Sequence, residues 1–299
     1  MRDFIGNQQI IKLFSNLKKE DLNHAYLFTG KEGTGKSKLA KQLAKSLQCP
    51  TGKPLKPCEK CPACLSKNLE TTILKGPEKI SIDEIRKIQK KMNLKSQDKS
   101  FKICIIDNAE RLTQEASNCL LKVLEEPPAK SIFILTTSKL KLVFSTIQSR
   151  CQIIKFLPVP KDILEQELKK LFPDQEINPG IINYADGAPG KAIRLLENQE
   201  FATELEEQKK LLYEFLKGST SKRFQITTEL SKLTYPEIKN TLEQWLSIVN
   251  LDLKEAKNPQ NENLTTFLRL LLEIKQKTDY NLNKRILLDQ LVIRGPRPR

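Results

Sequence analysis

The chain has 299 residues, of which 38% are hydrophobic and 29% charged, and its formal net charge is +15. This length allows about two or three domains with buried cores. No run approaches the about 18 uncharged apolar residues of a membrane span, and Met1-Arg2-Asp3-Phe4 lacks the apolar core of a signal peptide. We therefore expect a cytoplasmic protein without membrane contact. The basic excess favours a polyanionic partner such as nucleic acid, although solvated lysine-rich helix faces explain it equally well.

The segment from Gly30 to Ser37 reads GKEGTGKS and matches the phosphate-binding loop pattern G-x-x-x-x-G-K-[ST]. The apolar run over 25–29 predicts a buried strand before it, and apolar residues at helical spacing over 38–47 predict a helix after it. A glycine-rich turn can match this pattern by chance, but here strand, loop and helix follow in the required order. We therefore predict a site for ATP or ADP with Mg²⁺.

Each residue type in this loop has its own task in holding phosphate. Gly30, Gly33 and Gly35 let the backbone curl so that its N–H groups face phosphate oxygens. The N-terminus of the following helix adds partial positive charge. Lys36 is expected to reach the β- and γ-phosphates, and the Ser37 hydroxyl is expected to ligate Mg²⁺.

Four of the seven cysteines are close together in the sequence: Cys49, Cys58, Cys61 and Cys64. Disulfides are rare in cytosolic proteins, whereas the spacing C-x2-C-x2-C lets thiolates converge on one ion, and four cysteines make a closed structural Zn²⁺ site. Prolines make the intervening segment irregular, so a metal would order it. Four free thiols in a loop are the alternative. The other cysteines lie in apolar contexts and are expected in the core: Cys104, Cys119 and Cys151.

Beyond the cysteines, strands and helices alternate along the chain. Apolar patterns predict helices over 82–92 and 113–124, and strands over 102–106, 132–137 and 153–156. Asp107 ends the first of these strands, where a carboxylate can hold Mg²⁺ directly or through water. The alternation implies a parallel sheet with its ligands at the carboxyl ends of the strands.

The composition changes at Pro158-Val159-Pro160, which predicts a hinge. Helices are predicted over 161–171, 177–183 and 190–197, and after about residue 200 only helical spacing remains, over 205–215, 237–251 and 264–278. We therefore predict three domains: an α/β P-loop domain over 1–157 with the cysteine insert at 49–64, a small helical lid over 158–203, and an all-α domain over 204–299.

Several segments of the first half carry a family resemblance: Phe4-Ile5-Gly6-Asn7, His24 to Gly30, the four-cysteine insert, the LLKVLEEPP run from Leu120 to Pro128, and Ser149-Arg150-Cys151. Together they resemble the bacterial clamp-loader AAA+ ATPases of DNA polymerase III, most closely the delta-prime type. The LEEPP run and the SRC triplet are highly specific in combination, and the resemblance covers 4–151, about half of the chain. It implies an AAA+ domain, a helical lid and a helical collar that oligomerises the subunits.

The resemblance also implies roles for single residues and for partners. Arg150 of the SRC triplet would be an arginine finger for a neighbouring subunit's ATP, although from its pattern alone it is an ordinary loop arginine. Thr137, with Thr136, matches a sensor of the γ-phosphate, although threonines at a strand end need no such role. The partners would be gamma/tau and delta subunits in a hetero-oligomer, with the sliding clamp and primer–template DNA met through the complex.

Two positions depart from the hydrolysing members of this family. Asn108 stands where they carry a glutamate that orients the attacking water, and an amide cannot accept the water's proton; Glu110 is expected to point away. Gly190 aligns with a sensor arginine, which Lys191 replaces only weakly. We therefore interpret the chain as a delta-prime-type subunit of the DNA polymerase III holoenzyme with little or no ATPase activity of its own. The alternatives are an ATP-hydrolysing gamma/tau-type subunit and another AAA+ DNA repair ATPase.

Overall fold

The computed structural model describes residues 4–65, 71–75, 79–93, 101–255, 262–280 and 282–296. The chain divides into two compact units, one of Met1–Ile177 with Ala185–Lys191 and one of Asn178–Tyr184 with Ala192–Arg299. The division falls within the segment expected to be a lid, and the separation into three domains at residues 157 and 203 remains a prediction.

The first unit is built on a five-stranded sheet with the order β2-β3-β4-β1-β5, in which neighbouring strands are parallel. Its strands are β1 (Ala25–Thr29), β2 (Thr71–Lys75), β3 (Lys102–Asp107), β4 (Ser131–Thr137) and β5 (Gln152–Lys155). The strands β1, β3 and β4 are buried along their whole length, as continuous apolar runs predict for a sheet covered on both faces.

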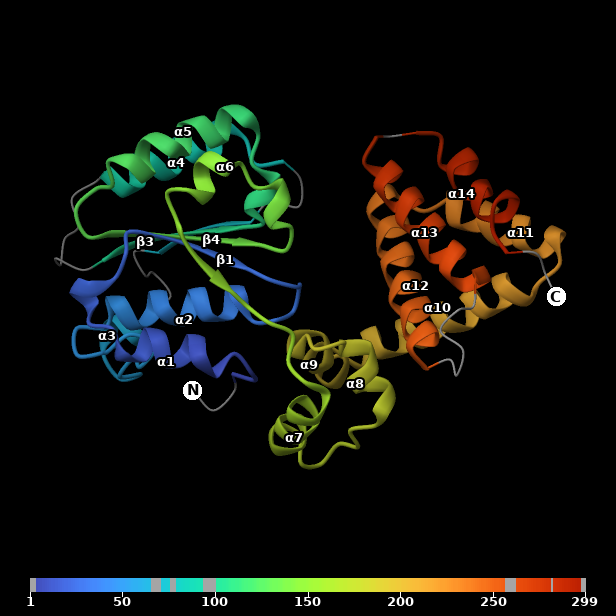
Figure 1. The fold of residues 1–299 in the computed structure, drawn as a ribbon, viewed down its shortest axis with the longest axis horizontal. Helices are drawn as coiled ribbons and strands as arrows, with labels where there is room; N and C mark the ends of the chain where they lie inside the picture. Colours follow the sequence, from blue (N-terminus) through green and yellow to red (C-terminus); the bar gives the residue numbers. More distant parts are fainter. Residues whose placement is uncertain are drawn as a thin grey trace. The chain divides into compact units, whose positions relative to one another are not determined.

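Helices cover both faces of this sheet (Figure 1). On one face lie α1 (Gln8–Asn16) and α2 (Lys36–Gln48), and on the other lie α4 (Ile82–Asn93), α5 (Gln114–Glu125) and α6 (Ser145–Gln148). Strand residues alternate between the two layers, so that Tyr26 and Phe28 pack with α1 and α2 whereas Leu27 packs on the other side. The short helix α3 (Pro62–Leu65) contacts α2. This arrangement confirms the predicted parallel α/β architecture.

Three helices follow β5: α7 (Lys161–Leu171), α8 (Pro179–Ala185) and α9 (Pro189–Glu197). The turn between α8 and α9 is fixed within the first unit. Gly187 has φ 73°, and its carbonyl accepts a hydrogen bond from the Val159 N–H at 2.8 Å. This turn therefore holds the start of α9 against the end of the sheet domain.

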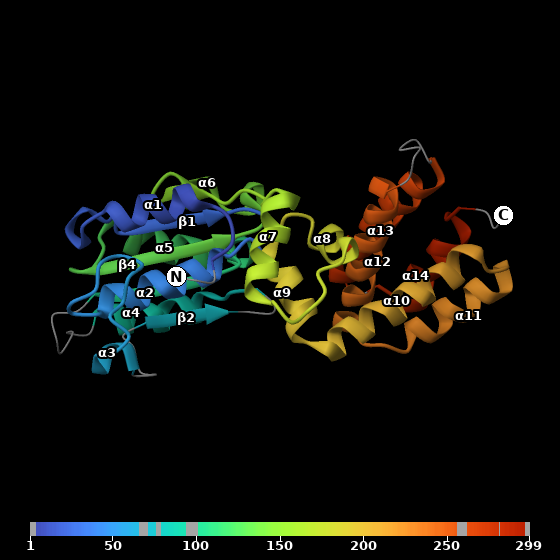
Figure 2. The same ribbon diagram turned by 90° about the horizontal axis from the view of Figure 1, so that it is seen from below.

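The second unit contains the helices α10 (Gln199–Lys217), α11 (Thr220–Ser231), α12 (Tyr235–Glu255), α13 (Glu262–Lys277) and α14 (Lys284–Ile293), shown in Figure 2. The aromatic side chains of Phe215, Trp245 and Phe267 are buried in its core. The ring centroids of Phe215 and Trp245 are 5.5 Å apart. The predicted all-helical C-terminal part is thereby confirmed. Among the described residues, no helix is both long and apolar enough to cross a lipid bilayer.

Candidate nucleotide site and four-cysteine cluster

The loop between β1 and α2 has the backbone that its glycines predict. Gly30, Gly33 and Gly35 have φ of 150°, 81° and 95°, a region that residues with a Cβ rarely adopt. A Cβ at Gly35 would also lie 2.8 Å from Cζ of Phe4, and one at Gly33 would lie 3.2 Å from Cβ of Ala188. The loop therefore curls tightly into the N-terminus of α2, where backbone N–H groups and the helix dipole favour an anion.

Lys36 is the first residue of α2 and is only 8% exposed. Its ammonium donates to the carbonyl oxygen of Gly30 at 2.6 Å and to that of Lys31 at 2.8 Å. Burial lowers the pKa of the Lys36 ammonium, and nearby carboxylates, foremost those of Glu32 and Glu110, act in the opposite direction. The lysine is thus held inside the loop, at the position from which it can contact a phosphate.

Ser37, Asp107 and Thr136 meet at the carboxyl end of the sheet. The Ser37 hydroxyl donates to Oδ1 of Asp107 at 2.7 Å, and the Thr136 hydroxyl donates to the same oxygen at 3.0 Å. Asp107 is the last residue of β3 and is buried. P-loop NTPases hold Mg²⁺ with a loop hydroxyl and such an aspartate. The residues present therefore fit a nucleotide with its magnesium ion.

The Thr136 side chain bonds to Asp107, whereas the Thr137 side chain bonds to the backbone that follows β4. Side chains alternate along a strand, and Oγ1 of Thr137 accepts a hydrogen bond from the Lys139 N–H at 3.0 Å. Ile106 pairs with Leu135 where β3 meets β4, which brings Asp107 beside Thr136, and no sequence pattern predicts that register. The sensor role of Thr137 remains a prediction.

Asn108 and Glu110 occupy the turn after β3. Asn108 has φ 60°, in the left-handed region that asparagine adopts more readily than most residues, so the backbone supplies a second reason for an amide here. Oε1 of Glu110 accepts hydrogen bonds from the Ser138 N–H at 3.2 Å and the Ser138 hydroxyl at 2.9 Å. Glu110 is therefore tied to the residue after β4, and no carboxylate directly follows Asp107.

The start of α9 lies against the phosphate-binding loop. The Gly190 N–H donates to the carbonyl oxygen of Gly33 at 2.8 Å, and a Cβ at position 190 would lie 3.0 Å from that oxygen. Lys31 of the loop forms an ion pair with Asp186 and donates to the Asp186 carbonyl oxygen at 3.0 Å. An arginine at position 190 would therefore require the Gly33 backbone to shift by a few tenths of an ångström.

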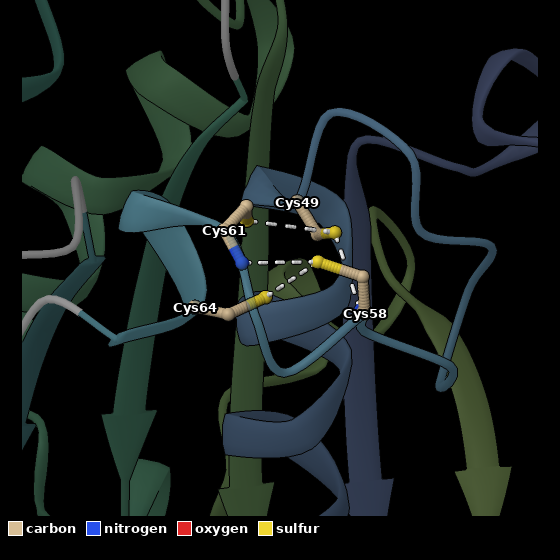
Figure 3. A group of neighbouring side chains, drawn as sticks. All are labelled: Cys49, Cys58, Cys61 and Cys64. Atoms are coloured by element: carbon tan, nitrogen blue, oxygen red, sulfur yellow. Dashed lines mark hydrogen bonds between the residues drawn. The ribbon is translucent and has the colours of Figure 1, made fainter.

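The four clustered cysteines converge on one point, as Figure 3 shows. Their sulfur atoms all lie within 4.8 Å of one another, and the Cys49–Cys61 and Cys58–Cys64 sulfur pairs are each 3.9 Å apart. Four thiolates at 2.3 Å from a tetrahedral Zn²⁺ would be separated by about 3.8 Å. The spacing of the sulfur atoms therefore fits a structural metal site.

The thiols of this cluster differ in acidity. Hydrogen bonds from the backbone N–H groups of Lys60 and Cys61 lower the pKa of Cys58 to about 6. Burial, together with neighbouring thiols, raises the pKa of Cys64 to about 12. The cluster is anchored to the first unit because Cys49 is buried and directly follows α2. Lys19 also donates to the Cys49 carbonyl oxygen at 2.6 Å.

Arg150 lies outside the nucleotide loop, between α6 and β5. Its side chain is 36% exposed and forms an ion pair with Glu125, the last residue of α5. It also donates to the Thr146 carbonyl oxygen at 3.1 Å and to the Ser149 hydroxyl at 3.4 Å. The sequence singled out Arg150 but not Glu125, because these residues are 25 positions apart and no motif spacing joins them.

Comparisons with known proteins agree with this geometry. The family profile described as "DNA polymerase III, delta subunit" matches residues 6–160. The delta' subunit of Bacillus subtilis strain 168 is 34% identical over 198 residues, which are 64% of this chain and 59% of that protein. The tau subunit of the same organism is 33% identical over 206 residues, which are 65% of this chain and 37% of that protein. The chain thus spans from about a third to three fifths of the length of these relatives.

A solved structure shares the fold over nearly the whole chain. It is a DNA polymerase III gamma subunit-related protein of Thermotoga maritima, with a TM-score of 0.57, 19% identity, and coverage of 96% of this chain and 97% of the other. At this identity the likeness concerns the fold alone, a parallel five-stranded α/β domain followed by a helical C-terminal part. The match to the family profile covers more than half of the chain, and the protein therefore belongs to the clamp-loader family of DNA polymerase III subunits.

Proposed function

We propose that the protein is a delta-prime-type subunit of the DNA polymerase III clamp loader and helps to load the sliding clamp onto primed DNA. In this role it binds nucleotide, hydrolyses it poorly, and supplies Arg150 to the nucleotide site of a neighbouring subunit. One observation carries the proposal: a complete phosphate-binding loop is paired with Asn108, so that no carboxylate directly follows Asp107.

Nucleotide binding is supported by the contacts within the pocket. The curled backbone of Gly30, Gly33 and Gly35 and the ammonium of Lys36 would bind the phosphates, and Ser37 with Asp107 would hold Mg²⁺. Bound Mg²⁺ would neutralise phosphate charge. We include Thr137 in this site as the sensor that the resemblance suggests.

Weak hydrolysis is supported by two positions. Asn108 can orient a water through its amide, but it cannot accept the water's proton. Gly190 has no side chain to contact a phosphate, and its backbone already bonds to Gly33 at 2.8 Å. Both features leave the pocket able to hold phosphate while lacking groups that assist its transfer.

Two observations support the trans role of Arg150: its side chain is partly exposed, and it forms hydrogen bonds with residues outside the phosphate-binding loop. A guanidinium placed at a neighbour's γ-phosphate stabilises charge in the transition state. Within the described residues, the side-chain hydrogen bonds of Arg150 go to Glu125, Thr146 and Ser149, and none goes to the phosphate-binding loop. The arginine is therefore available to a site outside its own pocket.

We further propose that Cys49, Cys58, Cys61 and Cys64 bind a structural Zn²⁺. The equal separation of the two sulfur pairs, 3.9 Å each, supports this assignment. The segment between Cys49 and Cys64 contains little regular structure besides α3. A metal would therefore contribute much of its folding free energy.

The proposed setting is a cytoplasmic hetero-oligomer with gamma/tau and delta subunits. In it, residues 158–203 would act as a lid and residues 204–299 as an oligomerising collar. The subunit would meet the sliding clamp and primer–template DNA through the complex. The net charge of +15 suits an assembly that encloses DNA.

A second candidate is an ATP-hydrolysing subunit of the gamma/tau type. It is favoured by Glu110, whose carboxylate acts on Lys36 electrostatically and whose Oε2 is buried and has no hydrogen-bond partner in the described part of the chain. In that case the Glu110 carboxylate would orient the attacking water in place of the glutamate that hydrolysing relatives carry at position 108.

ATPase assays of the isolated chain separate these candidates. The delta-prime-type proposal predicts turnover close to background with saturating Mg-ATP, although the nucleotide binds. Robust turnover that Glu110→Gln abolishes would establish the second candidate instead. Turnover in the complex with Arg150→Ala, compared with Lys155→Ala as an exposed control, then tests the arginine finger.

A further inference from the structure

The Arg150 side chain is held by its own chain at several points. Its Nη2 donates to the Glu125 carboxylate, and its Nη1 donates to the Thr146 carbonyl oxygen at 3.1 Å and the Ser149 hydroxyl at 3.4 Å. A guanidinium has more N–H donors than these contacts use. Donors therefore remain for a phosphate while the side chain is restrained.

The backbone on the Glu125 side of the pair is fixed. Glu125 is the last residue of α5, and its neighbour Leu124 is buried in the core between the sheet and the helices α4, α5 and α6. The following residue, Glu126, donates its N–H to the Lys122 carbonyl oxygen at 3.1 Å and is itself exposed. The end of the helix thus presents the Glu125 carboxylate from a defined position.

The backbone on the Arg150 side is fixed as well. Ile147 and Cys151 on either side are buried, and the Arg150 N–H donates to the Ile147 carbonyl oxygen at 3.1 Å. Gln148 donates to the carbonyl oxygen of Val143 at 2.8 Å, which holds the turn. Two segments with hydrogen-bonded backbones and buried neighbouring residues therefore meet at an exposed ion pair.

We infer that Glu125 is a positioning residue, which holds the Arg150 guanidinium in the orientation that meets a neighbour's phosphate. The inference rests on the proposed trans role of Arg150. An arginine on a surface otherwise samples many rotamers, and fixing one of them in advance removes that entropy cost from the catalytic step. Exposed ion pairs contribute little to folding, so orientation is the larger benefit of this pair.

The test uses the assembled clamp loader that contains this chain. Glu125→Gln is expected to lower the kcat of the complex roughly tenfold, the order of loss that follows a small misplacement of a catalytic group, with the KM for ATP almost unchanged. Glu126→Gln, the adjacent exposed glutamate, is the matched control and is expected to behave as wild type. In an Arg150→Ala background, Glu125→Gln is expected to add no further loss. Glu125→Asp keeps the charge on a shorter side chain and is expected to be intermediate.

The outcomes separate the inference from the proposed function. If Arg150→Ala impairs the complex but Glu125→Gln does not, the positioning role is overturned and the proposed function stands. If Arg150→Ala has no effect, the proposed function fails. Faster turnover with Glu125→Gln would identify the pair as a restraint and overturn the inference, as would equal losses from Glu125→Gln and Glu126→Gln. Should Glu125→Gln fail to assemble, wild-type kcat with Glu125→Asp would overturn the inference.

Discussion

The nucleotide pocket and the surface around Arg150 belong to the same domain but differ in the burial of their charged residues. In the pocket, Lys36 and Asp107 are 8% and 5% exposed and bond to neighbouring loop and strand groups. At the surface, the Arg150 side chain is 36% exposed and bonds, within the described residues, to Glu125, Thr146 and Ser149. We propose that the pocket encloses a nucleotide, whereas Arg150 acts on a nucleotide site outside this chain. A complete phosphate-binding loop therefore does not show that a chain hydrolyses nucleotide in its own pocket, because its catalytic group can act on a neighbouring subunit.

The largest effect is expected from removing one ligand of the proposed Zn²⁺ site, which lies at the opposite end of α2 from the phosphate-binding loop. Cys64→Ser is expected to abolish retention of zinc and to expose the segment 49–64 to proteases, because a structural site needs all of its ligands. Metal analysis and limited proteolysis measure both effects, with Cys119→Ser as the control. Wild-type protein purified without metal, yet equally resistant to protease, would contradict the zinc site.

The next largest effect is expected on the affinity for nucleotide. Lys36→Ala is expected to weaken binding of Mg-ADP or Mg-ATP by about 10- to 100-fold, since a hydrogen bond to a charged group contributes about 1.5–3 kcal/mol. Titration calorimetry on the isolated chain measures the affinity, and Lys41→Ala, on an exposed position of the same helix, serves as the control. An unchanged affinity would show that the pocket does not hold nucleotide in the proposed way.

A smaller effect is expected where α9 meets the loop. Gly190→Ala places a Cβ 3.0 Å from the Gly33 carbonyl oxygen and 3.2 Å from its Cα, and these backbone atoms can yield only slightly. We expect a loss of about 1 kcal/mol in the free energy of unfolding, measured by denaturant titration.

Gly180→Ala is the control for that substitution. Its Cβ would meet only the Asn178 side chain, at 3.1 Å, so we expect little change in stability. Equal stability of Gly190→Ala and wild type would show that the contact between loop and helix is loose.

The sequence predicted the central strands well because their apolar runs are continuous. The strand expected over 25–29 is β1, and those expected over 102–106 and 132–137 differ from β3 and β4 by a residue each. The edge strand β2 was missed, because it pairs with β3 alone and its Ile73 is 43% exposed. Its strand conformation depends on that pairing more than on its own pattern.

The site shows the same division between local and distant information. The phosphate-binding loop and the cysteine cluster were predicted because the residues of each lie within one short segment of the sequence. The contact of Thr136 with Asp107, 29 positions apart, depends on strand register. The pair of Glu125 and Arg150 depends on how α5 and the turn after α6 pack. Such contacts become visible only in three dimensions.

One measurement compares the two regions directly. ATP turnover is measured for the reconstituted clamp loader with Lys36→Ala, which impairs this chain's own pocket, and with Arg150→Ala, which impairs its surface. We predict a loss of about 1,000-fold or more at the neighbouring site with Arg150→Ala, as expected for an arginine finger, and only a minor change with Lys36→Ala. A larger loss from Lys36→Ala than from Arg150→Ala would contradict this prediction.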